Sequence, residues 1–136
     1  MVLAIEHIGS TSIPGISAKP IIDIAIGVAE LEDADEMKVG MLSIGYDYPR
    51  DVGIPDEYVF GRGHPDRKYI AHVQVFGSDH WNDYLMFRNL LREHRQLAEE
   101  YESLKLALAE KFGNDRATYG DRKAAFVAQV LGRQLT

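Results

Sequence analysis

The stretch over 5–28, IEHIGSTSIPGISAKPIIDIAIGV, constrains the fold of this 136-residue chain more than any other. Two apolar runs flank a segment over 9–20 with two glycines and two prolines, which helices and strands rarely accommodate. The pattern predicts a strand over 3–8, a loop over 9–20 and a second strand over 21–28. Asp23 is the lone acid of the second run. Because an unpaired buried carboxylate costs several kcal/mol, we expect Asp23 to have a partner or to face a cavity.

The rest of the chain changes from short strands to helices. The pattern predicts a helix over 30–44 that Gly45 ends, strands over 46–48 and 57–62, a turn over 63–68, a strand over 69–76, and helices from 78 or 79 to 94, from 95 to 112 and from 115 to 134. A strand-rich half (1–77) therefore precedes a helical half (78–136). We expect one domain over 1–136 with an α+β fold.

Composition narrows the classes of function. The net charge is −6, and no basic face of the kind that nucleic-acid backbones require is evident, so broad nucleic-acid binding is not expected. A small anionic ligand held by a few local cations fits better. The chain has no cysteine, no apolar run near the ~20 residues that span a bilayer and no signal-peptide pattern, so we expect a cytoplasmic protein that does not associate with membranes.

The loop after the first strand could hold an anion. Gly9, Ser10, Thr11 and Ser12 offer backbone N–H groups and three hydroxyls to an anion. A turn that only connects the two strands would have the same sequence pattern. The stretch is not a Walker phosphate loop, because five residues rather than four separate Gly9 from Gly15 and Lys19 precedes a proline. The candidate partner of Asp23 is Lys19 or an arginine from a helix, and Mg²⁺ with a bound phosphate is the alternative.

Polar side chains on later elements could complete a site. Alternation over 69–76 places His72, Gln74 and Phe76 on one face of the strand, where His72 and Gln74 could meet Asp23. The predicted helices supply cations that could reach a phosphate or equally form surface ion pairs; these are Arg88, Arg92, Lys105, Arg122 and Lys123.

The stretch over 5–28 resembles the signature of the GrpB family, which belongs to the nucleotidyltransferase superfamily that includes DNA polymerase beta. The resemblance continues through YIAHVQVF, WNDYLMFRNLLREH, YESLKLALAEKF and DRKAAFVAQVL. It implies a nucleotidyltransferase-like mixed β-sheet with flanking helices and a C-terminal helical segment. The family usually has an N-terminal helix before the first strand, and this sequence begins at that strand.

The resemblance also implies residue roles. Gly9 and Ser10 match the turn that holds a nucleotide triphosphate, and Asp23 matches the first metal-binding acid. The second acid falls at Ala25 and the third near His72 or Gln74, so the acid triad is incomplete. The implied site therefore has Asp23 and His72 as catalytic residues, Asp23, His72 and Gln74 as Mg²⁺ ligands, and phosphate contacts from Gly9, Ser10, Thr11, Ser12, Lys19, Arg88, Lys105 and Lys123.

Three functions follow as expectations. The first is a nucleotidyltransferase-like enzyme that uses Mg²⁺ to act on a nucleotide and an acceptor. The second is a non-catalytic module that binds a nucleotide or another phosphorylated small molecule. The third is an interaction domain linked to coenzyme A metabolism, because relatives occur fused to dephospho-coenzyme A kinase; its partner would be a kinase or a second copy of the chain.

Overall fold

The computed structural model describes residues 1–47, 57–63 and 66–132. Its order of elements is β1 (Val2–Ile8), a 3₁₀ turn (Ser10–Ser12), β2 (Ile22–Val28), α1 (Asp33–Ser43), β3 (Tyr46–Asp47), β4 (Tyr58–Arg62), β5 (Tyr69–Val75), α2 (Asp79–Glu93), α3 (Arg95–Phe112) and α4 (Arg116–Leu131). The predicted α+β fold is confirmed. The predicted segments also include residues 48, 64–65 and 133–134, which lie outside the described residues.

Two boundaries differ from the sequence-based prediction. The segment over 9–20 is not all irregular, because a short 3₁₀ turn forms at Ser10–Ser12. The last helix was predicted to reach residue 134, but α4 ends at Leu131. Gly132 takes a left-handed conformation with φ of 70°, and its N–H bonds back to the last turn of the helix, which terminates the helix there.

The strands form a five-stranded mixed sheet in the order β1-β2-β5-β4-β3. β2 and β5 run parallel, and the other neighbouring pairs are antiparallel. The register places Ala25 beside His72 and Gly27 beside Gln74. Side chains on a strand alternate between faces, so these residues and Asp23 point to the same side of the sheet.

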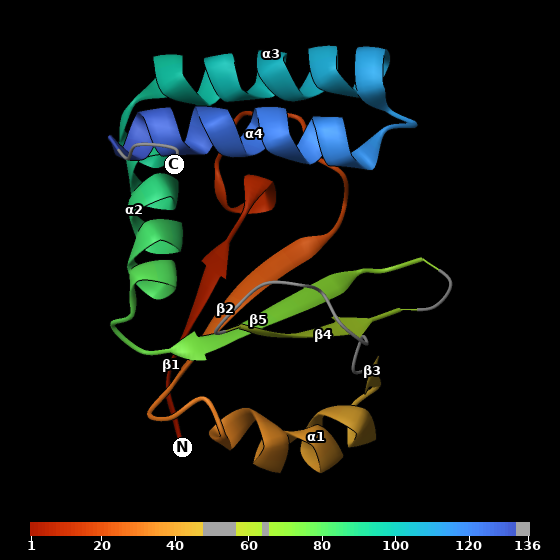
Figure 1. Cartoon of the computed structure of the whole chain (residues 1–136), viewed down its shortest axis with the longest axis vertical. Coiled ribbons are helices and arrows are strands. Elements are labelled where there is room, and N and C mark those ends of the chain that lie inside the picture. The colour runs from red at the N-terminus through yellow and green to blue at the C-terminus, as the bar shows by residue number, and fades with distance from the viewer. Residues whose placement is uncertain (48–56, 64–65, 133–136) are drawn as a thin grey trace.

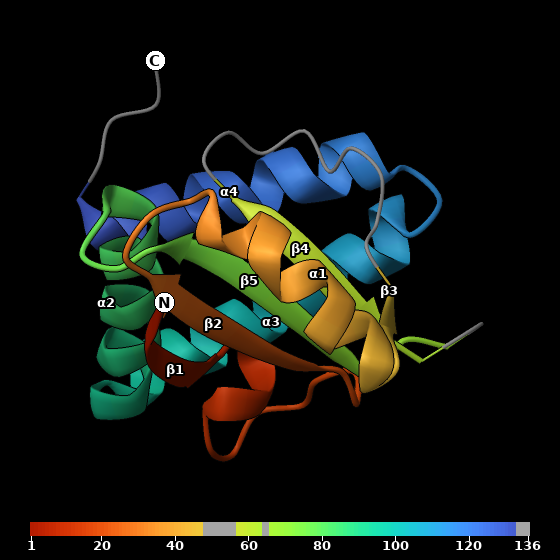
Figure 2. The same cartoon turned by 90° about the horizontal axis from the view of Figure 1, so that it is seen from below.

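The sheet separates two apolar regions. On one face, α1 covers a core that includes Ile26, Val28, Phe60 and Val73. Figure 1 shows α1 on one side of the sheet and α2, α3 and α4 on the other, and Figure 2 shows α1 lying across the strands. On the helical side, Trp81 of α2 packs against strand residues Ile8 and Ala25.

A third apolar cluster ties the loop after β1 to the helical layer. Ile13 and Ile16 of this loop pack with Leu91, Ala98 and Tyr101 from α2 and α3. The side chain of Ser78 caps α2, and that of Asp115 caps α4 by accepting from the N–H of Thr118 at 3.1 Å. The contacts of Ile13 and Ile16 hold the loop over 9–16 against the helical layer. None of the described helices is both long enough and apolar enough to span a bilayer.

Candidate functional site

The turn after β1 packs directly on the acid of β2. Gly9 has φ of 76°, and its carbonyl accepts hydrogen bonds from the N–H of Ser12 at 3.0 Å and the hydroxyl of Ser12 at 2.5 Å. A Cβ at Gly9 would lie 2.7 Å from Oδ2 of Asp23. Both the left-handed conformation and this close approach require glycine. The structure therefore brings the predicted turn and the predicted acid into contact.

The three hydroxyls of the turn have different surroundings. Ser12 is buried, and its hydroxyl is used within the turn. Oγ1 of Thr11 lies 2.9 Å from Nε2 of His7. Oγ of Ser10 accepts a hydrogen bond from Nζ of Lys105, which α3 contributes. Of the three, Ser10 is the hydroxyl that the fold places against a cation.

His72 lies between two carboxylates. Its Nε2 is 3.2 Å from Oδ1 of Asp23, and its Nδ1 is 3.2 Å from Oε1 of Glu57. An ionised carboxylate only accepts hydrogen bonds, so both ring nitrogens must carry hydrogen, which makes the ring an imidazolium. Burial by itself lowers the pKa of His72, but the hydrogen bonds to Asp23 and Glu57 outweigh burial and raise this pKa to about 9.

Glu57 is a member of this network that the sequence-based reasoning missed. Its side chain is fully buried, and Oε1 also accepts from Nε2 of Gln74 at 2.6 Å and from the hydroxyl of Tyr84 at 3.2 Å. Burial raises the pKa of Glu57, but the hydrogen bonds from His72, Gln74 and Tyr84 and the charge of His72 bring it below its usual value. Burial, with the adjacent Glu57 charge, raises the pKa of Tyr84 well above the usual tyrosine value, so Tyr84 remains a donor.

A signal for Glu57 was present in the sequence. It begins the predicted strand over 57–62, two positions before Val59, which pairs with His72 in the sheet. An acid at that parity faces the same side as His72 and Gln74. The sequence-based prediction did not include the order of the strands in the sheet, so it did not place β4 beside β5.

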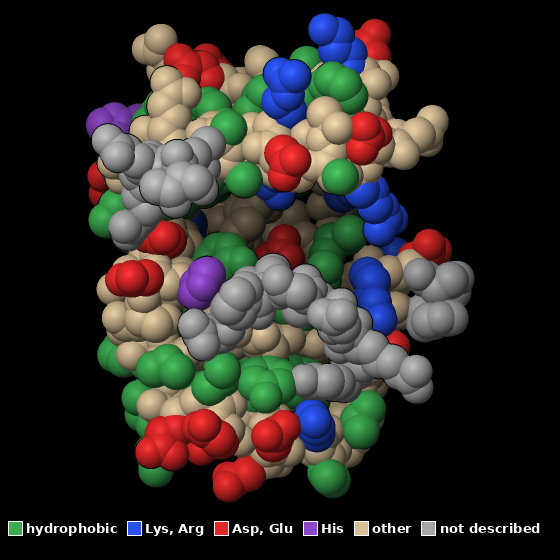
Figure 3. All heavy atoms as spheres, in the orientation of Figure 1, with side chains coloured by type: hydrophobic (Ala, Val, Ile, Leu, Met, Phe, Trp, Pro, Cys, Tyr) green, Lys and Arg blue, Asp and Glu red, His purple; other side chains and the backbone are tan. Residues whose placement is uncertain are grey.

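A pocket of about 280 Å³ opens above this network, between the sheet and the helical layer. Figure 3 shows the hollow, with acidic atoms at its floor and basic atoms along its helical rim. Its walls combine the strand residues with aromatic and aliphatic side chains from the helices; the lining residues are Ile8, Gly9, Asp23, His72, His80, Asp83, Tyr84, Phe87, Tyr101, Lys123, Val127 and Leu131.

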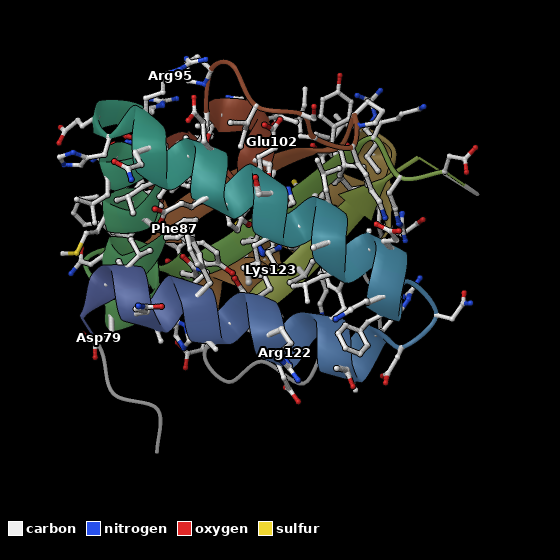
Figure 4. The ribbon with its side chains drawn as sticks, turned by 90° about the horizontal axis from the view of Figure 1, so that it is seen from above. Asp79, Phe87, Arg95, Glu102, Arg122 and Lys123 are labelled. Carbon is white, nitrogen blue, oxygen red and sulfur yellow. The ribbon has the colours of Figure 1, made fainter. Side chains whose placement is uncertain are left out.

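The helical cations do not all reach this pocket. Lys123 of α4 lines it, and Figure 4 shows Lys123 and Phe87 projecting into the space between α3 and α4, whereas Arg122 lies on the outer side of α4. Burial lowers the pKa of Lys105, and the neighbouring charge of Lys123 lowers it further, which Asp23 partly offsets. The two lysines therefore repel each other electrostatically.

Arg88 and Lys19 do not line the pocket. Arg88 donates to Oε2 of Glu6 at 2.8 Å and to the carbonyl of His7 at 3.1 Å, so its guanidinium is engaged with β1 and does not line the pocket. Lys19 is exposed in the loop before β2, and the described contacts do not pair it with Asp23. Its charge nevertheless contributes to lowering the pKa of Lys105.

The residues predicted as Mg²⁺ ligands do not form a metal cage. Mg²⁺ prefers an octahedron of oxygen ligands. Asp23 offers a carboxylate, but both nitrogens of His72 carry hydrogen, and Gln74 is fully buried with its amide turned to Glu57. Within 1–47, 57–63 and 66–132, no three His, Cys, Asp or Glu side chains are grouped as a metal site requires.

The absence of a second acid on β2 has a packing explanation. Ala25 is fully buried against Ile8 and Trp81, beside His72 in the register. A carboxylate there would be buried against an indole ring, whereas alanine leaves room for the imidazole. The position of the expected acid is thus part of the apolar contact between β2 and α2.

Comparisons with known proteins agree with this architecture. The family described as GrpB protein matches residues 1–133. The glutamate-rich protein GrpB of Alkalihalophilus pseudofirmus is 39% identical over 132 residues, which cover 93% of this chain and 76% of the relative. A UPF0157 protein of Pseudomonas aeruginosa is 36% identical over 98% of this chain, which spans only 56% of that relative.

A solved structure has the same fold. The crystal structure of the conserved protein GrpB from Enterococcus faecalis aligns with a TM-score of 0.76 and 31% identity, over 94% of this chain and 82% of the other. A weaker similarity, 24% identity, connects 96% of this chain with 39% of a dephospho-CoA kinase of Mycobacterium leprae.

Proposed function

This chain belongs to the GrpB family, and we propose that it binds a small phosphorylated ligand, with nucleotides as the first candidates, in the pocket between the sheet and the helical layer. The observation that carries the proposal is a pocket that Gly9 of the turn and Lys123 line together, beside a second lysine. Lys105 does not line the pocket, but it donates a hydrogen bond to Ser10, the residue that follows Gly9. The compact charge of a lysine ammonium group is well suited to binding phosphate.

The surroundings of the two lysines support an anionic ligand. No carboxylate in the described part of the chain forms an ion pair with either lysine. Their mutual repulsion and the partial burial of Lys105 disfavour the charged state, which is why the pKa of Lys105 is lowered. A bound phosphate would relieve that repulsion, and binding would favour the protonated form of Lys105.

Nucleotidyl transfer is the second candidate, and the contact between Gly9 and Asp23 favours it. Gly9 and Asp23 are the residues that resemble the turn and the first acid of the superfamily's pattern, and their contact supports this candidate. Since the described donors do not fit a Mg²⁺ cage, we derive no chemical step through a metal. An interaction domain that assists a kinase is a third candidate, supported only by the similarity to the dephospho-CoA kinase.

Isothermal titration calorimetry with ATP, AMP and tripolyphosphate tests the binding proposal. We expect Lys123→Met to weaken binding by roughly tenfold or more, the usual loss for a hydrogen bond to a charged group. Arg122→Met is the matched control, because Arg122 is the adjacent cation on the same helix and lies on its outer side, over the ring of Phe112.

Two results would contradict the proposal. The first is no binding of any of the three ligands. The second is an equal loss in Lys123→Met and Arg122→Met, which would show only a response to net charge. Repeating the titrations with Mg²⁺ and with a chelator, and following nucleotide turnover in Asp23→Ala, separates binding from transfer.

A further inference from the structure

Charges of both signs line the pocket, and Asp83 of α2 is an acid among them in addition to Asp23. Asp23 and Lys123 both line it, one from β2 at the floor and one from α4 at the helical rim. Lys105 reaches the same region from α3, through its hydrogen bond to Ser10. A ligand that fills this hollow therefore meets both acceptors and donors.

Oδ2 of Asp23 is the open acceptor. His72 uses Oδ1, and no hydrogen bond from the described residues reaches Oδ2. The Asp23 side chain is 28% exposed. A Cβ at residue 9 would lie 2.7 Å from Oδ2 and cover it, so Gly9 leaves this oxygen accessible. The local backbone thus preserves a carboxylate oxygen for a partner from outside the chain.

The network holds two carboxylates around one imidazole ring. The imidazolium of His72 bonds to Asp23 and to Glu57, and Glu57 is fully buried with no other cation bonded to it among the described residues. Asp23 and Glu57 therefore share one imidazolium, and Asp23 uses only Oδ1 for it. Among the described residues, His72 is the only cation that forms an ion pair with Asp23, and Lys105 adds a favourable charge interaction without an ion pair.

We propose that the ligand is an amine-bearing phosphate ester, whose phosphate binds Lys105 and Lys123 and whose ammonium donates to Oδ2 of Asp23. This inference rests on the proposed binding of a phosphorylated ligand. A protein-held Mg²⁺ would need several oxygen ligands, whereas a ligand ammonium can be satisfied by one carboxylate and water. The volume of about 280 Å³ suits a small molecule of this class.

A matched pair of ligands tests the inference. O-phosphoethanolamine and ethyl phosphate differ in the amine, and calorimetry at pH 7 in the presence of a chelator compares them. We expect wild-type protein to bind the amine-bearing ester roughly tenfold more tightly or better, as a charge-assisted hydrogen bond provides. In Asp23→Asn this preference should vanish while ethyl phosphate binding persists. Asp121→Asn, an exposed acid of α4, is the control for net charge.

The possible results of these titrations distinguish the amine inference from the phosphate-binding function. Equal wild-type affinity for the two esters overturns the amine inference and leaves the phosphate-binding function standing. An amine preference that survives Asp23→Asn also overturns it, because Asp23 would not be the recognising group. Binding that requires Mg²⁺ assigns Asp23 to a metal and overturns it as well. If neither ester binds but ATP, AMP or tripolyphosphate does, the amine inference is overturned and the proposed function stands. If none of the five ligands binds, the proposed function fails and the inference fails with it.

Discussion

The bridge from Asp23 through His72 to Glu57 should make the free energy of unfolding depend on pH in a specific window. The pKa of His72 is raised from 6.5 to about 9 in the folded state. A group whose pKa is raised by folding stabilises the folded state fully at a pH below its pKa in the unfolded state. This contribution is lost as the pH rises through its pKa in the folded state. At 1.36 kcal/mol per pKa unit, the contribution of His72 is about 3 kcal/mol below pH 6.5 and disappears above about pH 9.

Glu57 sets the acid side of the same window. Its pKa is lowered by the hydrogen bonds and charge of His72, which outweigh burial. Its contribution is therefore present above the ordinary value of 4.5 and is lost as pH falls through the lowered folded value. The bridge should stabilise the fold most between about pH 4.5 and 6.5.

Urea unfolding of the wild type and of His72→Gln from pH 5 to 10 measures the effect. The quantity to follow is the difference between the two proteins, because contributions that they share cancel in it. We expect this difference to shrink by about 3 kcal/mol between pH 6 and pH 10. An NMR titration of the His72 ring gives the pKa directly. Parallel pH profiles, or a ring pKa near 6.5, would refute the reasoning.

Three further predictions concern stability, each checked by urea unfolding. Gly9→Ala should lower the free energy of unfolding by about 1–3 kcal/mol, because it strains a left-handed residue and crowds Asp23. Gly40→Ala, on open helix surface, should leave the free energy of unfolding unchanged or raise it by up to about 1 kcal/mol. Equal effects of the two substitutions would contradict this prediction. Ala25→Asp should cost several kcal/mol, and recovery of stability on adding Mg²⁺ would show that a metal site had been restored instead. Asp115→Ala should lower the midpoint of urea unfolding by removing the cap of α4, and an unchanged midpoint would argue against the cap.

The sequence predicted the elements well because their signals are local. Alternation over 69–76 correctly placed His72 and Gln74 on one face, and glycines and prolines correctly marked the loop after β1. The helix ends were less accurate. Residue 132 is a glycine that could either continue or stop a helix, and its backbone conformation decided the end of α4.

The candidate site was predictable in part. The contact of Gly9 with Asp23 follows from two adjacent strands joined by one loop, which are close in sequence and close in space. Arg88 and Lys123 looked alike in sequence, as cations among apolar helix residues. Which cation reaches the pocket depends on how each helix is rotated against the sheet, and packing of Trp81 and Phe87 decides that for α2.

The sequence by itself determined the strands, the helices, the turn and the single acid on β2, because each depends on a few neighbouring residues. Only the tertiary structure decided which charged side chains surround that acid. Glu57 reaches His72 only because β4 lies beside β5, and Lys105 reaches Ser10 across 95 positions of the chain. Electrostatic interaction depends on distance in space and on burial, and neither can be read from spacing along the chain.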